Sequence, residues 1–315
     1  MVATAGWLAW TLLLPMAPQR QKFVLLRPGF STRHIASELQ SAGVIRSADA
    51  FILWHYIHRR RSLKAGEYLF EKNATSLEVH ERLARGDIYV HTVVIPEGFN
   101  IFEIAQSMQD AGLGPRQEFL DAEMNGSALV NDFAPEAKTM EGFLFPNTYE
   151  FTRTQSTQEM LAAMVKQFRQ VARQIGLNSD MQKTVIMASI IEKETSVLEE
   201  TPIVASVYYN RLNKKMALQA DPSVIYAELM EGKYTGALHH ADMQFNSAYN
   251  TYIHTGLPPG PIANPGKASL EAAMHPAATN YTYFVSDGNG HHRFARDLEE
   301  HNKNVAAYRR SMEGK

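Results

Sequence analysis

Two segments of the chain, Val24–Ile45 and Thr92–Leu113, repeat one another. The matched positions are Phe30 with Phe99, Ile35 with Ile104, Ala36 with Ala105, Leu39 with Met108, and an Ala-Gly pair that ends each copy. The pattern predicts, in each copy, a short apolar strand, a turn, a polar helix cap and an amphipathic helix stopped by glycine. Ser31 and Asn100 are the expected caps, and Glu103 occupies the acidic position of a capping box. The chain therefore contains two similar βα units, which requires a mixed α+β fold.

The helices and strands expected around the repeat divide the chain into two structural parts. Between the copies we expect a helix near 51–58, a strand in AGEYLF, a helix over Ser76–Arg85 and a strand over Tyr89–Ile95. The region from about Phe23 to Thr92 is thus a small α+β module. Residues 93–315 are expected to form a mainly helical domain, with helices near 157–176 and 181–195. A β-hairpin is predicted around the Asp-Gly-Asn-Gly turn at 287–290.

The N-terminus is apolar. From Val2 to Ala17 there is no charged residue, and two tryptophans are present. We predict a single transmembrane anchor over residues 1–18, although this stretch is shorter than the roughly 20 residues of a full span. The alternative is a buried N-terminal helix. Arg20, Lys22 and Arg27 follow, and the positive-inside rule on its own would place that side in the cytoplasm.

Composition excludes several classes of function. The net charge of −2 over 315 residues argues against nucleic acid as a partner. The absence of cysteine excludes disulfides and thiolate metal sites. The histidine pairs at 239–240 and 291–292 lack a carboxylate at a known ligand spacing, and there is no phosphate loop or dinucleotide motif. We therefore expect no metal and no cofactor.

The helix over 181–195 ends in Glu192-Lys193-Glu194. At about 100° per residue the two glutamates lie roughly 200° apart, so they cannot enter one pocket from a regular helix. Small residues share the Glu192 face, which predicts room for a ligand there, whereas the Glu194 face is bulky. A carboxyl against an apolar wall has a raised pKa, as a general acid requires. Glu192 is the predicted acid; the alternative is that both acids are a solvated helix end.

Several blocks in one order resemble the YceG-like (MltG) endolytic murein transglycosylases. They are IPEGFNIFEIA, EGFLFPNTY, ASIIEKET, VASVYYNRL, MALQADPSVIYA, YNTYIHTGLPPGPIANPG and YTYFVSDGNGHHRFA. The resemblance covers nearly the whole chain and implies an anchor, a LysM-like module over 23–92 and a catalytic domain over 93–315. It implies Glu192, the first acid of the triplet, as the catalytic residue. Glu194 matches the family's second glutamate, and we expect it to be either structural or a partner that shapes the substrate pocket.

The implied reaction needs one carboxyl group. The acid protonates the oxygen leaving C1 of N-acetylmuramic acid and then, as a base, takes the proton from the C6 hydroxyl, which closes a 1,6-anhydro ring. Water is not the nucleophile, so a second carboxylate is not required, in contrast to a hydrolase. The amides of Gln219 and Asn250 and the rings of Tyr249 and Tyr252 are the expected sugar contacts, with ordinary loop packing as the alternative for each.

The resemblance further implies nascent peptidoglycan glycan strands as substrate and penicillin-binding proteins as partners. It implies a single-pass protein of the inner (cytoplasmic) membrane, with the catalytic domain on the periplasmic or outer side. Two alternatives remain open. One is a hydrolytic muramidase, in which Glu141, Glu194 or Asp221 activates water. The other is a non-catalytic peptidoglycan-binding scaffold.

Overall fold

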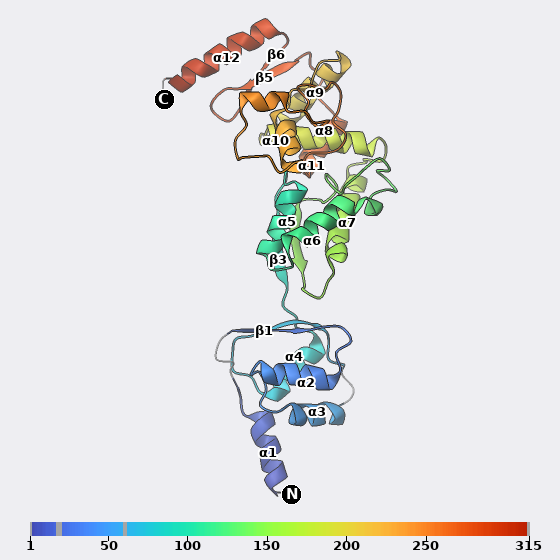
Figure 1. Cartoon of the computed structure of the whole chain (residues 1–315), viewed down its shortest axis with the longest axis vertical. Coiled ribbons are helices and arrows are strands. Elements are labelled where there is room, and N and C mark those ends of the chain that lie inside the picture. Colours follow the sequence, from blue (N-terminus) through green and yellow to red (C-terminus); the bar gives the residue numbers. More distant parts are fainter. Residues whose placement is uncertain (1, 17–20, 59–61, 314–315) are drawn as a thin grey trace. The chain divides into compact units, whose positions relative to one another are not determined.

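The structure, a computed structural model, describes residues 2–16, 21–58 and 62–313. Two compact units make up the chain (Figure 1). Unit 1 comprises Met1–Val93, Ala111–Gly114 and Glu150–Ser156, and unit 2 comprises Val94–Asp110, Pro115–Tyr149 and Thr157–Lys315. The boundary lies beside the one predicted at 92–93, but two short later segments group with unit 1.

Unit 1 is built on a two-stranded antiparallel sheet crossed by helices. Its elements are α1 (Val2–Leu13), β1 (Lys22–Leu26), α2 (Thr32–Ser41), α3 (Ala48–Ile57), β2 (Gly66–Phe70) and α4 (Ser76–Arg85). The register runs from Lys22 opposite Phe70 to Leu26 opposite Gly66. Alternate residues of β1 pack with the apolar faces of α2 and α4 into one core that includes Leu26, Leu39 and Leu83.

The predicted helix caps are present in both copies of the repeat. The Ser31 hydroxyl accepts the His34 N–H at the start of α2. At the start of α5 (Ile101–Asp110), Asn100 accepts the Glu103 N–H while the Glu103 carboxylate accepts the Asn100 N–H at 2.9 Å. The two repeats therefore fold alike locally, as predicted. β3 (His91–Ile95) pairs with β4 (Asn147–Phe151), and the chain passes between units within both strands.

Unit 2 is mainly helical. Its remaining elements are α6 (Arg116–Asn125), η1 (Ser127–Leu129), α7 (Thr157–Gln174), α8 (Met181–Glu194), α9 (Thr201–Asn213), α10 (Asp221–Met230), η2 (His240–Gln244), α11 (Lys267–Met274), β5 (Tyr283–Ser286), β6 (His292–Ala295) and α12 (Leu298–Glu313). The antiparallel β5–β6 pair is the predicted hairpin. Figure 1 shows α8 among α9, α10 and α11, and its residues 185–191 are all buried.

The predicted mixed α+β class is confirmed, with helices dominating and the sheets small. The anchor predicted over residues 1–18 corresponds to α1, and residues 1, 17 and 18 lie outside the described part of the chain. Within the described residues, no helix has both the length and the apolar character needed to cross a bilayer.

Candidate active site

The end of α8 directs three consecutive side chains to three different places. Residues 185–191 of the helix are all buried, whereas the last three residues are only partly buried or exposed. The Lys193 amine donates a hydrogen bond to the Gly98 carbonyl at 3.1 Å. Glu192 and Glu194 diverge, as the helical spacing predicts.

Glu192 caps a neighbouring helix. Its carboxylate accepts the N–H of Gly266, the N-cap residue of α11, at 2.9 Å. The Glu97 carboxyl also lies at this terminus, where it accepts the Lys267 N–H. Burial, reinforced by the nearby Glu192 charge, raises the pKa of Glu97. Two acids thus stabilise the positive end of α11.

The small side chains on the Glu192 face of α8 contact the loop that leads into α11. The expected room for a ligand beside Glu192 itself stays a prediction. The small residue Ser189 on this face does not border open space, because its hydroxyl accepts the Ile262 N–H at 3.0 Å. A Cβ on Gly98 would come within 3.4 Å of the Glu192 Cγ. The loop that leads into α11 and the turn at Gly98 therefore both lie against this face of α8.

Glu194 lines a pocket of about 260 Å³ in unit 2. The lining residues come from α8, α9, α10, β5, α12 and the 218–252 region; they are Glu194, Tyr208, Arg211, Leu218, Gln219, Asp221, Tyr252, Phe284 and His301. The Tyr208 hydroxyl donates to Glu194 Oε1 at 2.7 Å, which fixes the carboxyl at the pocket wall. The bulky face of α8 thus leads to the cavity.

The proton affinity of Glu194 suits acid–base chemistry. Burial, with a smaller contribution from the Asp221 charge, raises the pKa of Glu194 to about 7. The Tyr208 hydrogen bond and the Arg211 charge oppose this shift. A carboxyl with a pKa near ambient pH exists in both protonation states, so it can donate a proton and later accept one.

Arg211 and Gln219 form a fixed polar wall. Buried Arg211 donates to the carbonyls of Thr282 and Leu218, each at 2.7 Å. Gln219 adopts a left-handed conformation (φ 51°), and its N–H donates to the Thr251 carbonyl at 3.1 Å. A non-glycine residue in this conformation is strained, and such strain is typical of positions where a side chain is held for a ligand.

Tyr252 and Asp221 complete the pocket as a hydrogen-bonded pair. The Tyr252 hydroxyl donates to Asp221 Oδ1, and burial, followed by this bond, raises the pKa of Tyr252. Of the predicted site residues, the structure therefore brings Glu194, Gln219 and Tyr252 together around one cavity.

Tyr249 and Asn250 do not line this cavity. Asn250 is fully buried; its amide donates to the carbonyls of Met243 and Phe245, and its oxygen accepts the Tyr252 N–H at 2.9 Å. The Tyr249 ring lies against the Tyr226 ring at 5.0 Å. The predicted sugar contact of Asn250 is thus replaced by a role in shaping the loop that carries Tyr252.

Sequence reasoning missed His301 and Phe284 as pocket residues. His301 comes from α12, and its buried Nδ1 has no hydrogen-bond partner among the described residues. Burial and the Arg211 charge lower the pKa of His301, so the ring lines the cavity as a neutral group. No local motif marks it, because its place depends on how α12 packs on β5 and β6.

The histidine pair at 291–292 has a different partner. The Nδ1 atoms of His291 and His292 lie 3.0 and 2.7 Å from the two carboxylate oxygens of Glu200. In the part of the chain that the structure describes, no three His, Cys, Asp or Glu side chains are grouped to hold a metal ion.

Comparison with known proteins agrees with this architecture. A family model for the YceG-like family matches residues 24–307. The chain is 34% identical over 303 residues to the endolytic murein transglycosylase of Bacillus subtilis (strain 168), across 89% of this chain and 82% of that protein. It is 28% identical over 332 residues to the endolytic murein transglycosylase of Streptococcus pneumoniae serotype 2 (strain D39 / NCTC 7466), across 94% of this chain and 60% of that protein.

Among solved structures, the crystal structure of a YceG-like protein from Listeria monocytogenes matches with a TM-score of 0.59 and 31% identity. The match covers 90% of this chain and 99% of that one. The resemblance found in the sequence blocks is confirmed: this chain belongs to the YceG-like family.

Proposed function

We propose that this protein is an endolytic lytic transglycosylase that cleaves peptidoglycan between N-acetylmuramic acid and N-acetylglucosamine, leaving 1,6-anhydro-muramic ends. The names of the relatives from Bacillus subtilis and Streptococcus pneumoniae, both endolytic murein transglycosylases, support the reaction class. The observation that carries the proposal is the Glu194 carboxyl, which lines a polar pocket with a pKa of about 7.

Glu194 is proposed as the acid and base because it lines the pocket; Glu192, the acid that the family resemblance implies, stays the alternative, and the variants below distinguish the two. Protonated Glu194 donates its proton to the glycosidic oxygen as the bond from that oxygen to C1 of muramic acid breaks. The substrate's N-acetyl group stabilises the cationic centre at C1. The Glu194 carboxylate then accepts the proton of the C6 hydroxyl, while the oxygen of that hydroxyl forms the new bond to C1 and closes the 1,6-anhydro ring. One carboxyl with a near-neutral pKa serves both steps.

The other pocket residues orient this reaction. The Tyr208 hydroxyl holds the carboxyl, and Arg211 fixes the 218–219 backbone so that the Gln219 side chain lines the cavity. Gln219 and Tyr252 are the proposed contacts for sugar hydroxyl and acetamido groups, since amides and phenols both donate and accept hydrogen bonds.

A hydrolytic muramidase is the second candidate, and Asp221 is the observation that favours it. Asp221 lines the same pocket as Glu194, so a second carboxylate is available to activate water. Glu141, also weighed for this role, is fully buried and accepts the Ile101 N–H and the Asn264 amide at 3.0 and 2.8 Å. Its place in the fold therefore does not support such a role.

Mass spectrometry of products from purified glycan strands tests these assignments with full-length protein in detergent. Wild type is expected to make anhydro-muramic ends. Glu194→Gln is expected to lose on the order of 10²–10⁴-fold in rate, the usual contribution of a general acid. Glu192→Gln, two residues away on the same helix, is the matched control and should retain most activity.

Each other outcome has a definite meaning. Loss of activity in Glu192→Gln, with Glu194→Gln unaffected, would return the acid role to Glu192. Hydrated reducing ends would identify a hydrolase and point to Asp221. Intact strands with wild-type protein that still binds them would support the non-catalytic scaffold.

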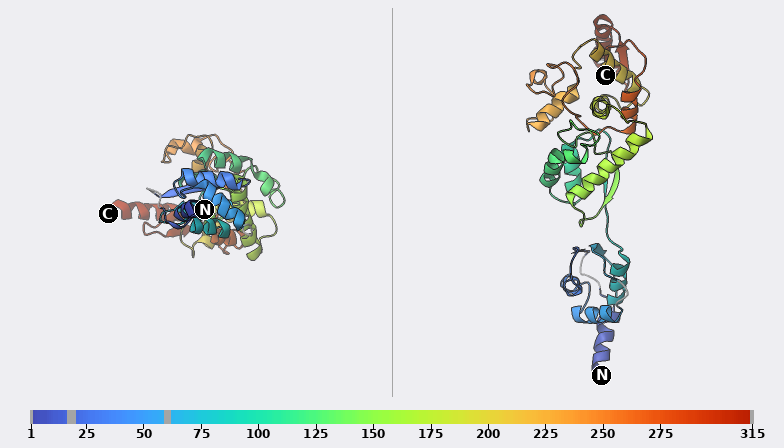
Figure 2. Two further views of the ribbon diagram at one scale, coloured as in Figure 1. Left: turned by 90° about the horizontal axis from the view of Figure 1, so that it is seen from below. Right: turned by 90° about the vertical axis from the view of Figure 1, so that its right-hand side faces the viewer.

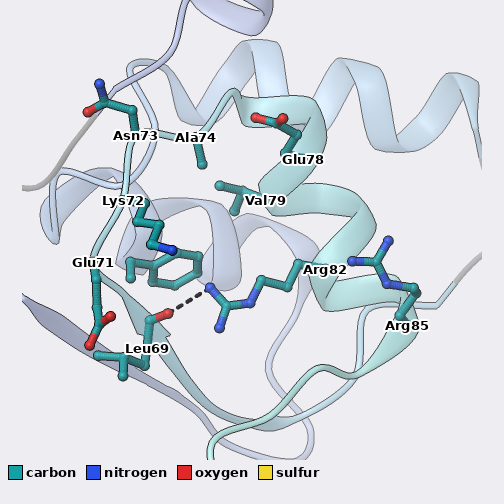
Figure 3. A pocket seen from close by; sticks show the side chains of 10 residues that line it. Leu69, Glu71, Lys72, Asn73, Ala74, Glu78, Val79, Arg82 and Arg85 are labelled. Atoms are coloured by element: carbon teal, nitrogen blue, oxygen red, sulfur yellow. Dashed lines mark hydrogen bonds between the residues drawn. The ribbon is translucent and has the colours of Figure 1, made fainter.

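Unit 1 supplies the proposed glycan-binding module. It contains a cavity of about 380 Å³ between the β2–α4 connection and α4 (Figure 3). In Figure 3, Lys72 and Arg82 extend into it; Arg82 donates to the Leu69 carbonyl at 2.6 Å and lies over the Phe70 ring. The Lys72 amine and the Asn73 amide, beside the Phe70 ring, suit the hydroxyl and acetamido groups of N-acetylated sugars.

The double variant Lys72→Ala/Asn73→Ala tests this module. It should weaken the binding of glycan strands without changing the chemical nature of the product ends.

The proposed location is the cytoplasmic membrane, with the segment 1–18 as anchor and the catalytic unit on the outer side. The uncharged stretch Val2–Ala17 and the peptidoglycan substrate support this location. Penicillin-binding proteins, which polymerise the same strands, are the proposed partners. The side of the membrane can be tested by introducing single cysteines into unit 2 and labelling them in intact cells with a membrane-impermeant reagent. Cysteines that this reagent does not label would contradict an outer location of unit 2.

A further inference from the structure

A second cavity of unit 2 lies at the opposite end of α8 from Glu194. Its volume is about 450 Å³, which is within the range of small-ligand sites. Its walls come from the α7–α8 connection at 176–180, the first turn of α8, helix α9, residue Leu257 and the end of α11. Figures 1 and 2 show these helices packed together in unit 2. We call this space the α8–α11 cavity.

Part of the α8–α11 cavity is apolar and held by the fold. Leu177, Leu212 and Leu257 line it together with the Tyr209 ring. The Tyr209 hydroxyl donates to the Ala273 carbonyl at 2.7 Å, so it joins α9 to α11 and is not itself free for a ligand. An apolar wall with a few polar groups beside it is the usual composition of a ligand site.

Two opposite charges line the same cavity. Asp180 and Lys183 stand at the start of α8, and both are exposed. The Asp180 carboxylate does not cap α8, because it accepts no N–H from that helix. Within the described residues, neither the Asp180 nor the Lys183 side chain pairs with another side chain. An anionic and a cationic group are therefore both available to a ligand.

This combination favours a ligand that carries both charges and small apolar groups. A neutral sugar would use neither the carboxylate nor the ammonium group, whereas a charged partner gains a charge-assisted hydrogen bond from each. The peptide stems of peptidoglycan have this chemistry. A stem is a short peptide with free carboxylates, the amine of a diamino acid and the methyl groups of alanine.

The distance from the proposed acid also suits a stem. Lys183 and Glu194 are about 16 Å apart along the axis of α8, at 1.5 Å per residue. An extended peptide of four residues spans up to about 14 Å, to which the lactyl link to muramic acid adds. Tyr208 of α9 lines the Glu194 pocket and Tyr209 lines the α8–α11 cavity, so the two sites lie on adjacent faces of α9. A stem on a strand bound at Glu194 is thus long enough to reach the cavity.

We infer that the α8–α11 cavity binds a peptide stem of the glycan strand. Lys183 contacts a stem carboxylate, Asp180 contacts the amine of the diamino acid, and the apolar wall receives the alanine methyl groups. This inference rests on the proposed function and adds to it a preference for strands that carry stems.

The test uses full-length protein in detergent and two substrates: glycan strands with stems, and the same strands stripped of stems by an amidase. Wild type is expected to cleave the first with the lower KM. Lys183→Met and Asp180→Asn should each raise this KM about tenfold, the effect of one lost charge-assisted hydrogen bond, with no matching change for stripped strands. Asparagine tolerates the left-handed backbone of residue 180 (φ 48°), so Asp180→Asn should fold. Lys166→Met, at an exposed position of α7 outside the cavity, is the matched control.

Binding measured without cleavage keeps this inference apart from the proposed reaction. Glu194→Gln protein should bind strands with stems more tightly than stripped strands, and adding Lys183→Met should remove the difference. Equal binding of the two strands would overturn the inference even where anhydro ends form. Equal losses on both strands in Lys183→Met, or an equal loss in Lys166→Met, would overturn it as well. Stem-dependent binding by wild-type protein that leaves strands intact would support the inference and contradict only the reaction.

Discussion

Two glutamates only two residues apart in one helix have different chemical surroundings. Glu192 contacts the N-terminus of α11, where its negative charge is favourable. Glu194 is the last residue of α8, and burial of its carboxyl, followed by the nearby Asp221 charge, disfavours its negative form. The pKa of about 7 for Glu194 thus arises from its surroundings and not from its residue type.

Tyr208→Phe tests the balance that sets this pKa. The Tyr208 hydroxyl stabilises the charged form of Glu194, so its removal should raise the Glu194 pKa above 7. If protonated Glu194 starts the reaction, kcat/KM falls as pH rises through that pKa. The falling limb should therefore move to higher pH, as a pH profile of strand cleavage would measure. Tyr209→Phe is the control, because the Tyr209 hydroxyl donates to the Ala273 carbonyl and not to Glu194. A falling limb that does not shift in Tyr208→Phe would contradict the assignment of Glu194 as the acid.

Glu123 is a second acid whose environment determines its protonation. It is fully buried, and neither carboxyl oxygen has a hydrogen-bond partner among the described residues. Burial, followed by the Glu141 charge, raises the pKa of Glu123 to about 10. The native state therefore keeps a proton that the unfolded chain releases above pH 4.5. Stability should fall as pH rises from about 4.5 toward 10.

Glu123→Met should remove this pH-dependent loss. Because an unpartnered polar group is replaced by an apolar one, the free energy of unfolding at pH 7 should rise by about 1–3 kcal/mol. Urea unfolding at several pH values measures both effects. Exposed Glu136→Met should change stability by less than about 0.5 kcal/mol. A less stable Glu123→Met protein would imply that Glu123 has a partner.

At the scale of elements, α8 organises unit 2. Its buried length packs against α9, α10 and α11, and its last three residues reach the α11 terminus, the 96–98 turn and the pocket. Two loops, near 141–144 and 260–266, close around it. Asn264 joins them, since its amide oxygen accepts the Leu144 N–H at 2.8 Å and its nitrogen donates to Glu141.

Gly142 is a position where the 141–144 loop, the 260–266 loop and α8 approach closely. Its φ is +86°, and an added Cβ would lie 2.5 Å from Pro261 and 2.7 Å from Val185 of α8. Gly142→Ala combines a left-handed backbone with overpacking of rigid neighbours, so it should destabilise the protein by about 2–4 kcal/mol. Gly176→Ala is the control: its φ is +76° with nothing within 4 Å, and only the backbone cost of about 1 kcal/mol should appear. Equal losses in chemical denaturation would contradict the packing argument.

At the scale of the whole molecule, one buried acid joins distant parts of the chain into unit 1. Glu67 of β2 contacts His91 Nε2 at 2.6 Å and Arg153 at 2.9 Å. The Arg153 guanidinium also donates to the Gly112 carbonyl at 2.7 Å. These contacts explain why residues 111–114 and 150–156 group with unit 1 although they are remote in sequence.

Glu67→Gln keeps the size of the side chain and removes its charge. We expect a loss of about 1–3 kcal/mol, below the figure for a wholly buried pair because Arg153 is partly exposed. Hydrogen exchange of the amides in 150–156 should accelerate, as mass spectrometry of peptides would detect. Glu71→Gln, an exposed neighbour in sequence that bonds Gln21, should leave that exchange unchanged. Unchanged exchange in Glu67→Gln would show that other contacts hold the segment.

The sequence by itself determined the local structure and the family. The repeat, the caps at Ser31 and Asn100, the helix over 181–194 and the hairpin depend on neighbouring residues, so periodicity and turn chemistry revealed them. The same blocks carried the resemblance to YceG-like proteins. Helical spacing also separated Glu192 from Glu194 correctly.

Only the tertiary structure decided which glutamate lines the cavity. Small residues on a helix face leave room that either a ligand or another part of the chain can occupy, and here the 262–266 loop donates hydrogen bonds to Ser189 and Glu192 on that face. Helices α9 and α12 supply Tyr208, Arg211 and His301 to the other face, across separations that local patterns do not encode. A pKa depends on burial and on nearby charges, which exist only once these segments have packed together.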